Sequence, residues 1–348
     1  MQRFFCYTLT AALFLFSAAG SLAQENKPHR IVLLGDFLPA GSADPIIKDR
    51  GLTHLFDGVR PVLTGSHVVF LNLETPLSQR GSPRQGKKYT FRAPPGTTDA
   101  MFKEGVRVVS LANNHILDFG YDALEDTFSN LGAAGIAWAG AGLDVTAARK
   151  PAVVPTPSGN LAFLAFSNTF PEDYWAGKNR PGTLFGAPLT VRKAVAAARS
   201  AGPVIASFHW GQELMTEPKD YQVDLAHLAI DLGVSLVVGH HPHVTQPIEI
   251  YRGRPILYSL GNFSFGSYSK SATVGLMALA EITADGWCQR LEVYPLLVDN
   301  SRVVFQPVII KGLEGQRIFD PLTASIPPEA AEVRWDGDKG VIIPRVIQ

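Results

Sequence analysis

Five segments of this 348-residue chain place polar side chains directly after an apolar run, and these side chains are of types that bind metal ions. They are Asp36, Glu74, Asn114 with His115, His209, and His241 with His243. Carboxylate and amide oxygens combined with imidazole nitrogens suit Mn, Fe or Zn better than Ca. We therefore expect a site for divalent metal ions that is assembled from distant parts of the chain.

Each of these motifs also has an ordinary explanation. The Gly-Asp pair ending at Asp36 and the Asn-Asn pair ending at Asn114 are common in turns, because glycine and asparagine tolerate left-handed backbone. His209 could be a hydrogen-bonded core histidine. His241 and His243 are harder to explain, since the proline between them stiffens the turn and both rings can face one centre. The convergence of all five segments favours metal binding over five separate turns.

The apolar runs before these residues predict buried strands, because they are continuous rather than alternating. The predicted strands are Ile31–Leu34, Val68–Leu71, Val106–Leu111, Leu161–Phe166, Val204–Phe208, Val234–Val238 and Ile256–Leu260. Helices are predicted at Tyr121–Ala134, at Lys219–Leu232 and from Thr190, as N-cap, to Ala201. Alternating strands and helices indicate an α/β fold. Parallel strands would bring the polar residues to one edge of the sheet, where ligands bind.

The later part of the chain has a different pattern. Val274–Thr283, Gln289–Leu297 and Arg302–Ile310 predict antiparallel strands that we expect to complete a second sheet. Residues 78–96 are rich in glycine, proline and basic residues and predict a long surface loop. The tail from Asp320 is proline-rich, with one short strand predicted at Val341–Ile343.

The first 23 residues have the layout of a secretory signal, with an early positive charge, a short apolar run and a small-x-small site ending at Ala23. The alternative is an N-terminal membrane anchor, but the run is shorter than the ~20 residues that a span needs. We expect cleavage after Ala23, a secreted or periplasmic protein, and no later transmembrane helix. Cleavage would leave Cys288 as the one cysteine, without an internal disulfide. A formal net charge of zero excludes bulk attraction to nucleic acid or an anionic membrane.

Five motifs together are similar to those of a known family. LLGD, FLNLETPL, SLANNHILDFG, ASFHWGQE and GHHPHVTQPIEIYRGRPILYSLGNFSF resemble the CapA family of poly-γ-glutamate capsule accessory proteins, relatives of the calcineurin-like metallophosphoesterases. The resemblance covers residues 30–266. It implies a four-layer α/β/β/α metallophosphoesterase-like sandwich with a dinuclear metal centre. We assign residues 30–310 to this domain and residues 311–348 to a C-terminal extension.

The resemblance also implies a role for each site residue. Asp36 and His243 would bind the first metal ion, and Glu74 would bridge both ions. Asn114, His209 and His241 would bind the second ion, while His115 would face the substrate as the catalytic acid or charge stabiliser. The wider superfamily has a histidine at the position of Leu38 and an aspartate at that of Glu74. A weakly held or single ion is therefore an open alternative.

Several other residues are candidates for supporting roles. Glu213 could orient the ring of His209, or could be a solvated carboxylate. Trp210 and Asn262 could line the pocket, although Trp210 could equally belong to the core. Asp118 is predicted to cap the helix near Tyr121. The basic side chains Arg84, Lys87, Lys88 and Arg92 could bind a polyanion or phosphate, with Arg84 and Arg92 as the substrate-binding candidates, or could form a solvated loop.

Two hypotheses about function follow. The first is an exported metal-dependent hydrolase for capsule or other envelope polymer biosynthesis, which uses metal-activated water on a phosphoester or amide. The second is a non-catalytic factor that binds an anionic polymer and assembles with a polymer synthase or export complex. A secreted nucleotidase-type phosphatase ranks lowest, because no nucleotide-binding domain is recognisable. No nucleic-acid partner is expected under any of the three.

Overall fold

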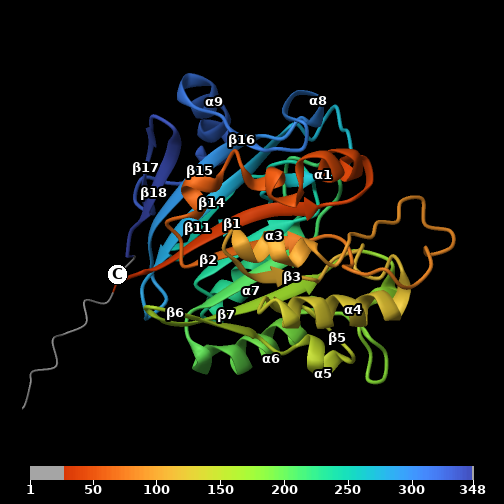
Figure 1. Cartoon of the computed structure of the whole chain (residues 1–348). Helices are drawn as coiled ribbons and strands as arrows, with labels where there is room; N and C mark the ends of the chain where they lie inside the picture. Colours follow the sequence, from red (N-terminus) through yellow and green to blue (C-terminus); the bar gives the residue numbers. More distant parts are fainter. Residues whose placement is uncertain (1–26, 347–348) are drawn as a thin grey trace, which may run out of the picture.

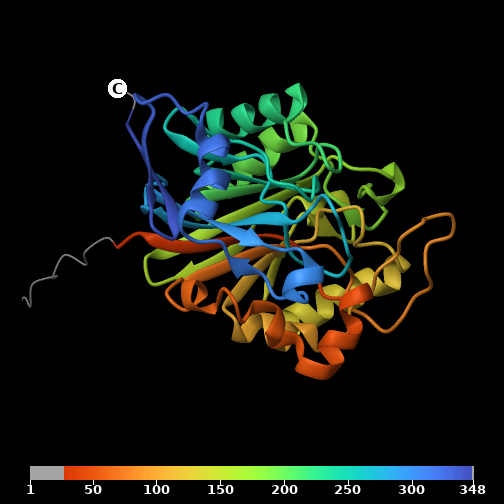
Figure 2. The same cartoon turned by 90° about the horizontal axis from the view of Figure 1, so that it is seen from above.

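The computed structural model describes residues 27–346, so the predicted signal at residues 1–23 lies outside the described residues. Two β-sheets pack face to face, and helices cover the outer face of each sheet (Figures 1 and 2). Figure 2 shows the four layers edge-on, with α6 and α7 on one side and α1, α3 and α4 on the other. The predicted α/β/β/α sandwich is confirmed.

The larger sheet has ten strands and contains the first three predicted ones side by side and parallel. Its main order is β17-β18-β15-β14-β1-β2-β3-β4, with β13 beside β1 and β16 beside β15. The strands are β1 (His29–Leu38), β2 (Val68–Leu73), β3 (Val106–Ser110), β4 (Ala137–Ala139), β13 (Asn262–Phe265), β14 (Val274–Ile282), β15 (Cys288–Leu297), β16 (Val308–Ile309), β17 (Ala331–Asp336) and β18 (Lys339–Pro344).

The second sheet consists of strands from the middle of the chain, in the order β11-β12-β10-β9-β7-β6. They are β6 (Ala152–Thr156), β7 (Gly159–Ser167), β9 (Val204–His209), β10 (Leu236–His240), β11 (Ile248–Tyr251) and β12 (Arg254–Leu257). The prediction that the later antiparallel strands form the second sheet is wrong. β14 pairs instead with β1, because both are long, apolar strands that are buried on both faces. A separate two-stranded sheet joins β5 (Ala141–Gly142) and β8 (Gly182–Thr183).

Alternation along the strands divides the core into three apolar layers, because successive side chains point to opposite faces. Ile31 and Leu33 of β1 meet Phe163 of β7 between the sheets. Val32 and Leu34 face the helices on the outer side of the larger sheet. The ring centroids of Phe70 and Phe163 are 5.6 Å apart in stacked geometry, which joins the two sheets directly.

Helices close both outer faces with apolar stripes. The helices are α1 (Asp44–Arg50), α2 (Arg60–Leu63), α3 (Thr97–Lys103), α4 (Gly120–Ala133), α5 (Val145–Ala148), α6 (Pro188–Ala198), α7 (Asp220–Asp231), α8 (Asn300–Val303) and α9 (Gly312–Thr323). The predicted N-cap at Thr190 is wrong, since α6 begins at Pro188 with Ala187 as its N-cap. Proline is accepted in the first turn, where its missing N–H leaves no helical bond unmade.

The prediction of a strand over Arg302–Ile310 is largely wrong. The side chain of Asp299 accepts a hydrogen bond from the backbone N–H of Ser301 and starts the short helix α8. Val304 and Phe305 then adopt left-handed backbone, with φ of 52° and 62°, which is incompatible with a strand. Only β16 remains of the predicted strand.

The segment after residue 310 is built into the core. β18 pairs with β15, and α9 places Phe319 in the apolar layer between the sheets. A Cβ atom on Gly340 would lie 2.0 Å from the Phe319 ring, so only glycine allows this close approach. Cys288 is fully buried in the same layer. Within residues 27–346, none of the helices has the length and apolar character needed to cross a membrane.

Phe319→Ala tests whether the C-terminal segment is part of the cooperative fold. Phe319 is 1% exposed, so its truncation should lower the free energy of unfolding by about 3–5 kcal/mol. The matched control on the same helix is Leu313→Ala, because Leu313 is 72% exposed and should change stability by less than about 0.5 kcal/mol. Urea denaturation measures both values, and equal effects would show that α9 is peripheral.

Candidate metal centre

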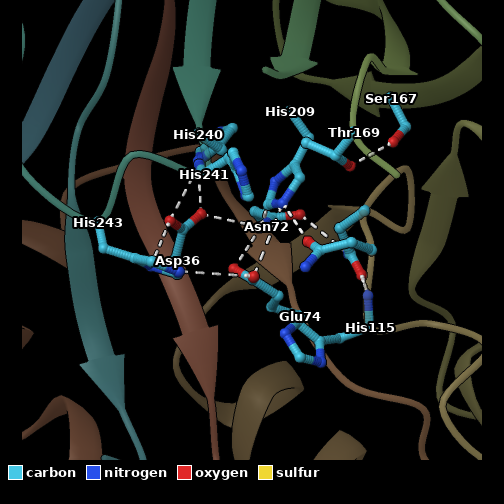
Figure 3. Close-up of polar contacts among 12 residues, drawn as sticks. Asp36, Asn72, Glu74, His115, Ser167, Thr169, His209, His240, His241 and His243 are labelled. Atoms are coloured by element: carbon cyan, nitrogen blue, oxygen red, sulfur yellow. Dashed lines mark hydrogen bonds and ion pairs between the residues drawn. The ribbon is translucent and has the colours of Figure 1, made fainter. Parts of the chain in front are cut away.

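The polar residues predicted from the sequence meet where strands of both sheets end, as Figure 3 shows. Asp36 lies in β1, and Glu74 follows β2 directly. His209 is the last residue of β9, and His241 follows β10. The sequence pattern predicted that all these strand ends lie on one edge of a single sheet. In the structure, the ends belong to two sheets, which together form the site.

Asp36 is completely buried and touches three histidines. Its two carboxylate oxygens lie 3.3 Å from Nδ1 of His240 and 3.3 Å from Nδ1 of His243. The backbone N–H of His241 donates to Oδ2 over 3.2 Å. Burial alone would raise the pKa of Asp36, but His240 and His243 hold that pKa well below its usual range.

The backbone at Asp36 is held by the segment around Gly261, which packs closely against it, and not by a turn. The N–H of Asp36 donates to the carbonyl of Gly261 over 3.0 Å. A Cβ atom on Gly35 would lie 2.1 Å from that carbonyl oxygen. The Gly-Asp pair therefore belongs to strand β1, and glycine is needed so that the neighbouring segment can approach.

Glu74 is the acid shared by two groups of potential ligands. The ligand atoms of Glu74, His241 and His243 lie within 4.8 Å of one another, and so do those of Asp36, Glu74 and His209. Burial and the neighbouring charge of Asp36 raise the pKa of Glu74 well above its usual range. Oε1 of Glu74 is buried without a hydrogen-bond partner in the described part of the chain. A buried carboxylate oxygen in this state is stabilised by a cation.

The histidine rings are also suited to metal binding. Burial, followed by the charge of His243, lowers the pKa of His241 to about 3, and burial lowers that of His209 well below its usual value. Both rings are therefore neutral and can offer a lone pair. Burial opposes the charge on His243, yet Glu74 and Asp36 raise its pKa to about 9. Nδ1 of His241 has no hydrogen-bond partner within residues 27–346. Divalent ions fit these residues.

The turn that carries His241 and His243 has strained backbone. Their φ angles are 95° and 59°, a region that residues other than glycine rarely adopt. Such conformations cost about 1–3 kcal/mol each and persist only where surrounding contacts enforce them. The Nδ1 atom of His243 lies 2.9 Å from Oδ1 of Asn262, which is one such contact. The strained turn therefore lowers the stability of the fold, and it places both histidine rings close to Glu74.

His115 is held by a carboxylate and a lysine. Its Nδ1 lies 2.7 Å from Oδ2 of Asp118, and its ring lines the open side of the site. Lys87 donates to Oδ1 of Asp118 over 2.5 Å and to the carbonyl of Asn114. Burial lowers the pKa of His115, and Asp118 opposes that effect. The prediction that Asp118 caps the helix is wrong, because its oxygens are engaged here and Phe119 is the N-cap of α4.

Asn114 reaches the centre from the same turn, and Asn113 shapes that turn. Oδ1 of Asn114 lies 2.8 Å from Nε2 of His209. Asn113 donates to the carbonyl of Leu73 over 2.8 Å and accepts from the backbone N–H of His115 over 3.1 Å. The two asparagines therefore have different tasks, one in the site and one in its support.

Sequence reasoning missed Asn72 and His240. The side-chain nitrogen of Asn72 donates to Oδ1 of Asp36 over 2.8 Å and to Oε2 of Glu74 over 3.2 Å. It also lies 3.2 Å from Nδ1 of His209. His240 lay within the histidine-rich motif, and Asn72 stands two residues before Glu74, so both could have been found by asking what supports the ligands.

Trp210 and Glu213, two candidates for supporting roles, do not have the neighbours that were predicted for them. Trp210 is fully buried and donates from Nε1 to the carbonyl of Tyr258, so its assignment to the pocket is wrong. Trp210 follows the last residue of β9 and packs in the apolar cluster formed with helices α6 and α7. The ring nitrogens of His209 lie beside Asn72 and Asn114, whereas Glu213 lines the open side of the site.

Asn262 lies at the open side of the site, while the two arginines predicted to bind substrate lie elsewhere. Asn262 lines the same cleft as His115 and His243. Arg84 forms an ion pair with Asp173. Arg92 donates to the carbonyl of Arg80 over 2.8 Å and stacks 4.3 Å above the ring of Phe119. Neither arginine lines that cleft.

Comparisons with known proteins agree with the motifs. The family described as bacterial capsule synthesis protein PGA_cap matches residues 30–267. PGA biosynthesis protein CapA of Bacillus subtilis is 32% identical over 293 residues, which cover 83% of this chain and 76% of that protein. Capsule biosynthesis protein CapA of Bacillus anthracis is 30% identical over 309 residues, covering 86% and 74%.

Among solved structures, the NAD nucleotidase NadN of Haemophilus influenzae aligns with a TM-score of 0.47 and 11% identity. The alignment covers 86% of this chain and 56% of that one. The family match covers residues 30–267, which contain every motif of the metal centre, and the alignments with the two Bacillus relatives cover 83% and 86% of this chain. The chain belongs to the bacterial capsule synthesis protein family PGA_cap.

Proposed function

We propose that this protein is a metal-dependent hydrolase that acts on a phosphoester or amide during synthesis of an envelope polymer. The observation that carries the proposal is the pair of ligand triplets that share Glu74, whose buried Oε1 has no partner in the described residues. Structural ion pairs do not explain this arrangement, because two buried acids, two buried histidines and the partly buried His243 offer ligand atoms within a few ångströms of one another. A site for two cations does explain it.

Glu74 would bridge the two ions, and the remaining ligands would divide between them. The resemblance pairs Asp36 with His243, and their 3.3 Å contact supports that pairing. It pairs His209 with Asn114, which are 2.8 Å apart. The triplets group the histidines differently, because Glu74 is within reach of all three. Two bound ions would lower the pKa of water and stabilise negative charge on the attacking and leaving oxygens.

His115 would serve the leaving group. Asp118 accepts a hydrogen bond from Nδ1, so the ring is fixed and Nε2 is the nitrogen left to interact with substrate. The carboxylate also stabilises the doubly protonated ring, which can give a proton to a departing oxygen or nitrogen. Lys87 holds Asp118 from the other side and keeps that carboxylate in place.

Leu38 bears on how firmly the ions are held. Its side chain is fully buried in the apolar layer beneath the helices and supplies no ligand. The first ion would therefore lack the nitrogen that the wider superfamily has at this position. His240 lies 3.3 Å from Asp36 and would orient that carboxylate. Weaker binding of one ion is the expected consequence.

The biological setting follows from the relatives. Two of them are named for PGA and capsule biosynthesis. A relative in Mycobacterium tuberculosis, 40% identical over 213 residues, is named a probable polyglutamine synthesis accessory protein. With the predicted secretory signal, these names support a periplasmic or secreted protein that works beside a polymer synthase or export complex. The second candidate function is a non-catalytic assembly factor. The missing metal ligand at Leu38 supports it, because a weakly bound ion would activate water poorly.

Metal content separates the two candidates. The wild-type chain should hold about two ions after reconstitution with Mn or Zn, and His241→Ala/His243→Ala should lose them, because the resemblance assigns His243 to the first ion and His241 to the second, so each ion loses a ligand. His227→Ala is the control, since His227 pairs with Glu249 outside the centre. Elemental analysis gives the count. One ion per wild-type chain would show that one of the two proposed sites is weakened. No ion in the wild-type chain would support the assembly factor.

His115→Ala should lower kcat for a phosphodiester by about 100-fold or more without changing metal content, because proton transfer to the leaving group is lost. Asp118→Asn should lower kcat by about tenfold or more with little change in KM, since the ring loses its charged partner. Asp122→Asn, an exposed acid in the first turn of α4, is the control. Steady-state kinetics measure both constants. A normal kcat in His115→Ala would refute this role.

A further inference from the structure

The metal centre opens into one cleft of about 570 Å³. His115, His243 and Asn262 line its inner end, so a substrate that reaches the centre passes through it. Tyr89 and Phe91 of the loop of residues 78–96 also line the cleft, and Figure 1 shows that this loop protrudes from the sandwich. The cleft is therefore the place where the part of the substrate next to the reacting bond is recognised.

Aromatic rings form much of the cleft wall. The ring of Phe91 lies 5.0 Å from that of His115, and the ring of Phe265 lies 4.7 Å from that of His243. Farther out, Tyr89 is 59% exposed and Tyr268 is 63% exposed. Exposed tyrosines beside a polar cleft provide flat apolar surfaces that carry a hydrogen-bonding group.

Away from His115 and His243, the polar groups of the cleft are suited to hydroxyls and amides rather than to anions. Ser42, Ser267 and Ser269 contribute hydroxyls, which both donate and accept hydrogen bonds. Glu213 contributes a carboxylate, which accepts hydrogen bonds and repels negative charge. The residues that line the cleft include neither lysine nor arginine.

The nearby basic loop does not make up for this. Arg84 pairs with Asp173, and Lys87 pairs with the buried Asp118. Arg92 is bound to a carbonyl and to the Phe119 ring. Arg92 and Lys88 therefore have no carboxylate partner among the described residues, and Nζ of Lys88 lies 4.8 Å from the Tyr89 ring. Three of the four positive charges are therefore already engaged.

From this arrangement, we infer that the cleft binds uncharged sugar rings next to the reacting bond, with Tyr89 and Tyr268 stacking on them. The substrate would then be a glycan or glycan-linked phosphoester, and not a polyanion such as poly-γ-glutamate. Serine hydroxyls and Glu213 would hydrogen-bond to sugar hydroxyls. The inference names the substrate class for the hydrolase proposed above and rests on that function.

Binding without turnover tests the inference. Isothermal titration calorimetry of the full mature chain would compare three uncharged tetrasaccharides, namely chitotetraose, cellotetraose and maltotetraose, with tetra-γ-glutamate. At least one saccharide should bind more tightly than the glutamate oligomer. Tyr89→Ala and Tyr268→Ala should each weaken that binding about tenfold, whereas Tyr268→Phe should change it less than about twofold, because the ring remains.

Tyr121→Ala is the matched control, because Tyr121 is also an exposed tyrosine but lies on α4 outside the cleft. Its saccharide affinity should equal that of the wild type. Binding of none of the three saccharides would overturn the inference. Preferential binding of tetra-γ-glutamate, weakened by Lys88→Ala, would overturn it in favour of a polyanion.

The outcome is separable from that of the proposed hydrolysis. A chain that hydrolyses a phosphodiester with added Mn or Zn but binds no saccharide would retain the proposed function and lose this substrate class. A chain that binds saccharides through Tyr89 and Tyr268 but never hydrolyses a phosphodiester or amide would lose the catalytic proposal and keep the saccharide site.

Discussion

The burial of two carboxylates, Asp36 and Glu74, at the junction of the two sheets is the constraint on which the rest of this structure depends. Moving two like charges out of water costs several kcal/mol for each ion unless they are paired and hydrogen-bonded. The chain supplies partial compensation from Asn72, His240 and His243. Oε1 of Glu74 remains without a hydrogen-bond partner among the described residues, and a bound cation would stabilise its negative charge.

Rigid elements on all sides make that arrangement possible. The acids come from parallel strands that are buried on both faces, and the histidines come from a second sheet that is fixed to the first by stacked aromatic rings. Left-handed backbone at His241 and His243 is tolerated only because these elements cannot move apart. By contrast, His115 is held by Asp118 and by Lys87, and Lys87 comes from a surface loop. The proposed metal ligands are therefore positioned by the two sheets, and His115, the proposed proton donor, is held partly by a loop.

Much of this could be predicted from the sequence. Continuous apolar runs mark strands such as β2 and β9 because burial on both faces leaves no polar alternation. The residues after those strands were recognisable because carboxylates and imidazoles at strand ends have few structural uses. Pairing between strands was not predictable from pattern alone, so β14 was assigned to the wrong sheet. The hydrogen-bond partners of Asp118 and Trp210 could not be predicted from the sequence either, because they depend on which residues the tertiary fold brings to these side chains.

The position of β1 has a consequence for how this protein matures. This strand pairs with β2, β13 and β14, and its residue Arg30 is bound to Glu281, 251 positions away. Closing such long loops is slow, because their entropy must be lost before native contacts form. Asp36 therefore meets its histidines only after most of the chain has been made and has collapsed. Binding of metal ions at the proposed centre would therefore be a late event, and a chain exported unfolded would acquire its ions at its destination rather than in the compartment of synthesis.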